Sequence, residues 1–127
     1  MLHSSGMALP EIHARLATSY ILFMALAAVW NLVAAARRQG VTGTAFGILV
    51  IGELLALGQA ALGLALALGG DSPARAVHIL YGVTTVLTLP AYYAFSKGRD
   101  DRTAAFIYAG LCLFLAIAGY RAVLTGA

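Results

Sequence analysis

The chain has 127 residues, of which 61% are hydrophobic and 10% are charged, and its formal net charge is +3. A water-soluble domain carries about a quarter charged residues, so this composition excludes an ordinary soluble globule and predicts one membrane domain over residues 1–127. The eight basic residues are scattered over segment ends and loops and form no stripe, which argues against a nucleic-acid partner.

Four stretches are long and apolar enough to cross a bilayer as helices, which takes about 20 residues whose backbone groups are paired within the segment. They cover residues 12–36, 44–68, 73–96 and 103–124. The short connections between them favour antiparallel neighbours, so we expect an all-α membrane bundle of four helices with up-down-up-down order. Ser72 and Pro73 are predicted to begin the third helix, and Pro90 is predicted to kink it.

The distribution of lysine and arginine predicts how the bundle is oriented, because these residues are enriched in cytoplasmic loops. Three basic residues, Arg15, Arg75 and Arg121, lie at the ends of the stretches on the side of the termini. Five lie on the opposite side, at Arg37, Arg38, Lys97, Arg99 and Arg102. We therefore expect the first and third loops to be cytoplasmic and both termini to lie outside, in the inner (cytoplasmic) membrane of a bacterium.

Glu53 is the most unusual residue of the second stretch, because an ionisable group inside a bilayer is costly. It lies roughly 13 Å from the cytoplasmic edge at 1.5 Å per residue. Asn31, Tyr92 and Tyr108 enter from the same side at comparable depth and are candidate hydrogen-bond partners. The functional interpretation is a proton relay or a quinone-site carboxyl, and the structural one, which is favoured, is a protonated contact with another helix or subunit.

Three further features of these helices are interpreted as packing. Gln59 is expected to bond to a neighbouring helix through its amide. Gly52, Ala56 and Ala60 form a face of small residues that lets another backbone approach closely. Cys112, the only cysteine, excludes an internal disulfide and is expected to be a small packing residue.

His13 and His78 open the first and third helices on the outer side and support a sharper hypothesis. In an up-down-up-down bundle these helices are diagonal neighbours across the core, so their imidazoles can bind the iron of a haem b from both sides. Arg15, Arg75 and Arg121 lie at the same level, where guanidinium groups pair with propionates. The alternative is that both histidines lie in the membrane interface or contact a partner. Two histidines alone are too few for a zinc site.

Two stretches carry a resemblance to known proteins. They read GILVIGELLALGQAALGLAL and PARAVHILYGV…LPAYYAFSKGRDDRTAAFIYAGLCLFLAIAGYRA, and they resemble a group of small bacterial membrane proteins with four helices. This resemblance implies the fold but no chemistry. The general plan is also similar to the membrane-anchor or cytochrome b-type subunits of respiratory complexes, an analogy of architecture alone.

The sequence contains no GxSxG, P-loop or HExxH pattern, so it indicates no catalytic activity of its own. We expect a small subunit of a larger membrane complex, accessory to respiratory or photosynthetic electron transfer, with the bilayer and other membrane subunits or further copies of the chain as partners. The alternatives are a small b-type cytochrome, with His13 and His78 as ligands, and a proton-coupled transporter centred on Glu53.

Overall fold

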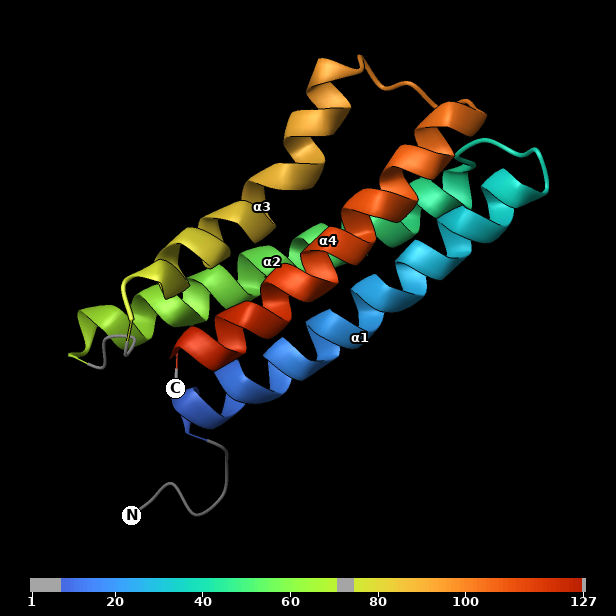
Figure 1. Cartoon of the computed structure of the whole chain (residues 1–127). Coiled ribbons are helices and arrows are strands. Elements are labelled where there is room, and N and C mark those ends of the chain that lie inside the picture. The colour runs from blue at the N-terminus through green and yellow to red at the C-terminus, as the bar shows by residue number, and fades with distance from the viewer. Residues whose placement is uncertain (1–7, 71–74, 127) are drawn as a thin grey trace.

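The structure of the chain is a computed structural model that describes residues 8–70 and 75–126. It contains four helices, α1 (Leu9–Ala36), α2 (Gly43–Leu68), α3 (Val77–Phe95) and α4 (Arg102–Gly126). Figure 1 shows consecutive helices running in opposite directions, so α1 begins and α4 ends at the same end of the molecule. The prediction of an all-α four-helix bundle is confirmed. The predicted helix start at Ser72 and Pro73 lies outside the described residues.

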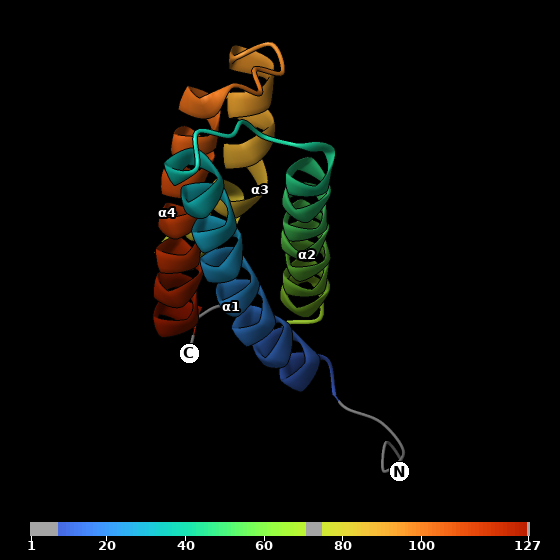
Figure 2. The same ribbon diagram turned by 90° about the vertical axis from the view of Figure 1, so that its right-hand side faces the viewer.

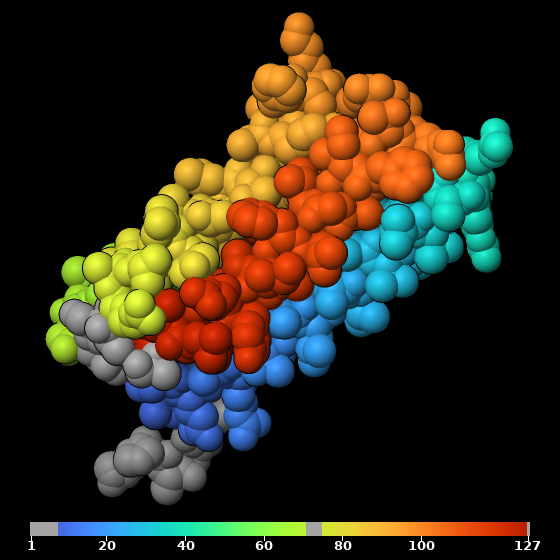
Figure 3. All heavy atoms as spheres, in the orientation of Figure 1, coloured from blue at the N-terminus to red at the C-terminus, as the bar shows by residue number. Residues whose placement is uncertain are grey.

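The four helices form a square bundle in which each helix packs on two neighbours. In the described part of the chain α1 contacts α2 and α4, and α3 contacts the same two helices, so α1 and α3 are diagonal to each other. The contact between α1 and α4 is the most extensive, and the contact between α2 and α3 is the smallest. Figure 2 places α2 and α4 on opposite sides of the bundle, and Figure 3 shows α4 filling one face between α3 and α1.

Small residues explain why α4 is the best-packed helix. Its buried positions recur at three- and four-residue intervals, at Ala104, Ala105, Tyr108, Ala109, Cys112, Leu115, Ala116 and Gly119. This spacing places them on one face of the helix, and most of them are small enough for the α1 backbone to come close. Cys112 is fully buried, which confirms its predicted place in the packing.

Three of the helices, α1, α2 and α4, are long and apolar enough to cross a membrane. The structure therefore supports a membrane protein. The third predicted span is a shorter helix of 19 residues, and among the described residues it does not reach the length and hydropathy of the other three. Its polar residues include Thr84, Thr85 and Thr88, whose hydroxyl groups donate hydrogen bonds to carbonyls of their own helix.

Helix α3 also differs from the others in shape. It contains Pro90 in its interior, which cannot donate a backbone hydrogen bond and crowds the carbonyl four residues earlier. Figure 1 shows α3 bending between its two halves, so that its second half leaves the line of the first. The kink predicted for this helix is therefore present.

The first and third loops lie together at one end of the bundle and are joined by hydrogen bonds. The backbone N–H of Val41 donates to the carbonyl of Asp100 over 2.7 Å, and Arg102 Nε donates to the carbonyl of Ala35 over 2.6 Å. Asp101 Oδ1 accepts from the backbone N–H of Ala104 over 2.9 Å and caps α4. This bond and a hydrogen bond from Arg99 lower the pKa of Asp101.

Candidate functional site

His13 and His78 meet inside the end of the bundle that holds the start of α1. His13 is the fifth residue of α1 and His78 the second residue of α3, and the two helices are diagonal to each other. Their ring centroids lie 6.2 Å apart, with the ring planes at 73°. Both side chains are partly buried. The sequence-based expectation that these imidazoles face each other across the core therefore agrees with the structure.

The two imidazoles are held differently. His78 Nδ1 lies 2.7 Å from the carbonyl oxygen of Ala122 in α4. Because a carbonyl can only accept, Nδ1 carries a proton, and in the neutral tautomer Nε2 then has the lone pair. His13 Nδ1 is buried and has no hydrogen-bond partner. The backbone of His13 is fixed instead, since Gln59 Nε2 of α2 donates to its carbonyl over 2.8 Å. This bond confirms the predicted contact of Gln59 with a neighbouring helix.

Two glycines adjoin the imidazoles, and one of them makes room for a ring. A methyl group at Gly126 would lie 2.6 Å from His78 Cε1 and 2.7 Å from its Nδ1, which no real side chain allows. A methyl group at Gly63 would lie 3.4 Å from His13 Cε1, an ordinary van der Waals distance, so Gly63 adjoins His13 without being required to be glycine. Sequence reasoning did not find these neighbours, because nothing in the spacing of Gly63 and Gly126 relates them to histidines on other helices.

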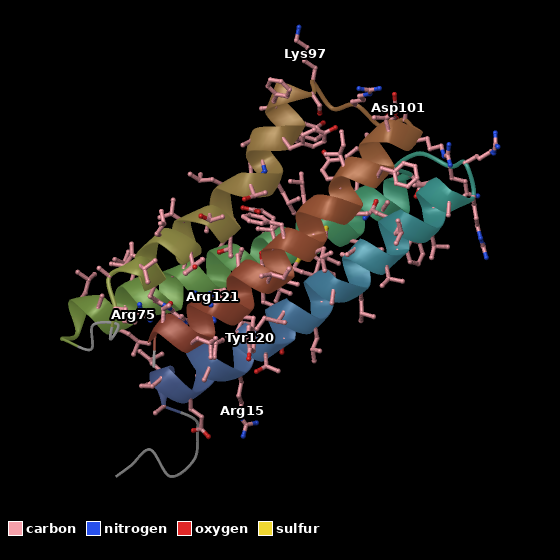
Figure 4. All side chains as sticks on the ribbon, viewed as in Figure 1. Arg15, Arg75, Lys97, Asp101, Tyr120 and Arg121 are labelled. Carbon is pink, nitrogen blue, oxygen red and sulfur yellow. The ribbon has the colours of Figure 1, made fainter. Side chains whose placement is uncertain are left out.

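The three predicted arginines lie at the histidine end of the bundle. Figure 4 shows Arg75 and Arg121 at this end and Arg15 pointing away from the bundle, with Lys97 and Asp101 at the opposite end. All three arginines are exposed. Arg15 lies 3.8 Å from Glu11, one turn earlier on α1, so Arg75 and Arg121 are the better placed of the three to pair with a second anion.

Glu53 lies on α2, away from the histidines, and its Oε1 is buried without a hydrogen-bond partner. Two of its three candidate partners make no hydrogen bond to Glu53. Asn31 donates to the carbonyl of Ala27 in its own helix over 3.0 Å, and the hydroxyl of Tyr108 is buried without any partner. The hydrogen bonds proposed from these residues to Glu53 are therefore wrong in this structure. The third candidate, Tyr92, packs edge-to-face on Tyr108 with ring centroids 4.9 Å apart.

The face of small residues on α2 divides between two environments. Gly52 and Ala56 are buried, and a methyl group at Gly52 would lie 2.6 Å from Met24 Sδ of α1. Ala60 is exposed and lines a hollow against α3. The close approach of another helix therefore holds for the first two positions, where α1 packs on α2.

A pocket of about 440 Å³ lies beside Glu53, between α2 and the second half of α3. Its wall combines apolar and aromatic side chains with the Glu53 carboxyl, and it includes Phe46, Leu49, Pro90, Tyr93 and Tyr108. The other described acidic residues, Glu11, Asp100 and Asp101, are exposed, so Glu53 is the only acid of the described chain that is partly buried. Sequence reasoning singled out Glu53 but not the pocket.

No protein-family model, no curated protein and no solved structure matches this chain. Within the described residues, no three histidine, cysteine or acidic side chains converge as a metal-binding group. The histidine pair and the pocket beside Glu53 are thus the two places where the geometry itself indicates chemistry.

Proposed function

We propose that this chain is a small membrane-embedded electron-transfer subunit whose His13 and His78 bind one haem b from opposite faces. The separation of the imidazoles carries the proposal. Two imidazoles that face each other at close range would be able to hold one haem iron between them, because histidine is a ligand of haem iron. The observed separation is 6.2 Å, between residues of diagonal helices with no sequence proximity.

The donor groups of this pair fit an iron. A histidine that ligates a metal donates its other ring N–H to a carbonyl or carboxylate, which fixes the tautomer and the orientation of the ring. His78 makes this bond to Ala122 and leaves Nε2 available. His13 retains a buried Nδ1 without a partner, so this imidazole also has an unsatisfied nitrogen. A haem iron between two imidazoles supplies one-electron chemistry.

Other residues of the chain would position and balance such a group. Gln59 ties α2 to the backbone at His13, and Ala122 ties α4 to the ring of His78, so two further helices, α2 and α4, hold the pair. Arg75 and Arg121 lie at the same end and suit the two propionates, because guanidinium groups bind carboxylates with paired hydrogen bonds.

The exposed surface supports a role within a larger assembly. Only 17% of the apolar window of α2 is buried within the chain, against 44% of that of α4, so α2 offers an apolar face to lipid, another subunit or a second copy. We place the chain in the cytoplasmic membrane of a bacterium as part of this proposal, and the arginine and lysine count favours residues 37–42 and 96–101 on the inner side.

A haem titration of the purified protein in lipid nanodiscs tests the proposal. The wild-type chain should bind one haem and show a sharp Soret band with resolved α and β bands on reduction. His13→Ala and His78→Ala should each lose this spectrum, whereas His3→Ala, the third histidine of the sequence, should keep it. The proposal fails if the wild-type chain binds no haem, or if both alanine variants bind it unchanged.

A further inference from the structure

The pocket beside Glu53 differs from an ordinary packing gap in its polar groups. Glu53 and Tyr108 both line it, and each contributes a buried oxygen without a hydrogen-bond partner, Oε1 of Glu53 and the hydroxyl of Tyr108. Tyr108 is 1% exposed. Buried polar groups in native structures are almost always satisfied, so two unsatisfied oxygens at one pocket indicate that a ligand supplies the missing bonds.

The ionisable residues that line the pocket restrict the charge of the ligand. The pocket is lined by one acid and by no lysine, arginine or histidine. A phosphate headgroup placed there would meet a carboxyl group and no cation, which is costly in a medium of low dielectric constant. A neutral head with oxygen atoms avoids this cost, and it can accept from the Tyr108 hydroxyl and exchange a hydrogen bond with the Glu53 carboxyl.

The aromatic side chains and the volume of the pocket further restrict which ligand can bind. Three aromatic side chains, Phe46, Tyr93 and Tyr108, line the pocket, and Phe46 packs edge-to-face on each of the other two with centroids 6.0 Å apart. Aromatic walls of this kind favour a flat ring in stacked or edge-to-face contact. The volume of about 440 Å³ lies within the range of about 300–1,000 Å³ for small-molecule sites.

The same two helices, α2 and α3, also offer space for an apolar tail. A second hollow of about 270 Å³ lies along the same two helices and is lined by Ala60 of α2 and by Gly82, Val83, Val86 and Leu87 of α3, all without polar side chains. The contact between α2 and α3 is the smallest of the four, and the bend of α3 at Pro90 moves its second half away from the line of the first. The seam thus offers a polar end beside Glu53 and an apolar run toward the histidine end.

We propose that this pocket binds the ring of a neutral, membrane-soluble quinone or quinol, with Glu53 and Tyr108 as its hydrogen-bond partners and the α2–α3 seam as the path of its isoprenoid tail. The inference rests on the proposed placement in a membrane but not on haem. Glu53 lies ten residues from Gly63, which adjoins His13, or about 15 Å along the helix, so the two sites are separate.

Binding of decylubiquinone to the haem-free protein in nanodiscs tests this inference. Tyr108→Phe and Glu53→Leu should each weaken binding about three- to tenfold, as expected for one lost hydrogen bond. The matched controls Tyr120→Phe and Glu11→Leu change exposed residues outside the pocket and should bind as the wild type does. His78→Ala should also bind normally, which separates this outcome from failure of the haem proposal.

Two further measurements keep the test decisive if a variant fails to fold. Val50 lines the pocket and is 57% exposed, so Val50→Trp should fold and block the site. Decylbenzene, which has the tail but no oxygen atoms, should compete at least tenfold more weakly than decylubiquinone. The inference is overturned if decylbenzene competes equally well, if Val50→Trp leaves the affinity unchanged, or if Tyr108→Phe and Glu53→Leu both bind like their controls.

Discussion

The packing of α4 against α1 allows a quantitative test with two glycines of one helix. Gly119 is buried and Gly110 is exposed. A methyl group at Gly119 would lie 3.1 Å from Ile21 Cγ1 and 3.2 Å from Tyr20 Cδ2, whereas one at Gly110 would meet nothing within 4 Å. Carbon atoms pack best at about 3.5–4.0 Å, so Gly119→Ala forces α1 and α4 apart or displaces the Tyr20 ring.

The expected difference in the free energy of unfolding between the two variants follows from two contributions. Replacing a helical glycine by alanine gains about 1 kcal/mol of helix propensity at either position, and this term cancels when the two variants are compared. Overpacking a close contact costs about 1–3 kcal/mol and applies only to Gly119. Gly119→Ala should therefore be less stable than Gly110→Ala by about 1–3 kcal/mol.

Unfolding of both variants in detergent, followed by circular dichroism as sodium dodecyl sulfate is added, measures this difference. The stability of the wild-type chain should lie between those of the two variants, or close to that of Gly119→Ala. Equal stabilities for the two variants would refute the close approach of α1 and α4 at Gly119.

Three other predictions concern Arg102 at the loop end of the bundle, Asp101 at the start of α4 and the buried Cys112. Arg102→Leu removes the bond from Nε to the Ala35 carbonyl and should lower the free energy of unfolding by about 1–2 kcal/mol, measured in the same titration, with exposed Arg38→Leu as the control. Because the pKa of Asp101 is lowered in the folded chain, its stabilising effect is present above the unfolded pKa and is lost as the pH falls through the folded one. Asp101→Asn, which keeps a capping side chain, should therefore show a weaker loss of stability in acid, and an unchanged acid profile would contradict this assignment. Cys112 is fully buried, so the folded protein should resist maleimide labelling until it is unfolded, and rapid labelling of the native protein would contradict the packing of α4.

The helices were predictable from the sequence because each apolar run is bounded by glycines and charges. The predicted stretches 12–36 and 44–68 agree closely with Leu9–Ala36 and Gly43–Leu68. The third helix was predicted over 73–96 and is observed over Val77–Phe95. Among the described residues it is not one of the three helices that are long and apolar enough to span a membrane, and whether it crosses the bilayer stays a prediction.

The candidate sites were predictable only in part, because their partners come from distant helices. The meeting of His13 and His78 followed from helix order, since diagonal helices of a four-helix bundle face each other. The carbonyl that holds His78 and the glycine that makes room for its ring both depend on the packing of α4, which no local pattern encodes. Asn31 was assigned to Glu53 from depth alone, whereas its nearest acceptor is the carbonyl one turn earlier in its own helix.

Electron paramagnetic resonance of the haem-loaded ferric protein tests most directly whether His13 and His78 together hold one iron. Two imidazole ligands should give a low-spin ferric signal, and His13→Ala or His78→Ala should convert any remaining haem to a high-spin, five-coordinate form. A high-spin signal from the wild-type chain, or a low-spin signal that survives loss of both histidines, would contradict the proposed site.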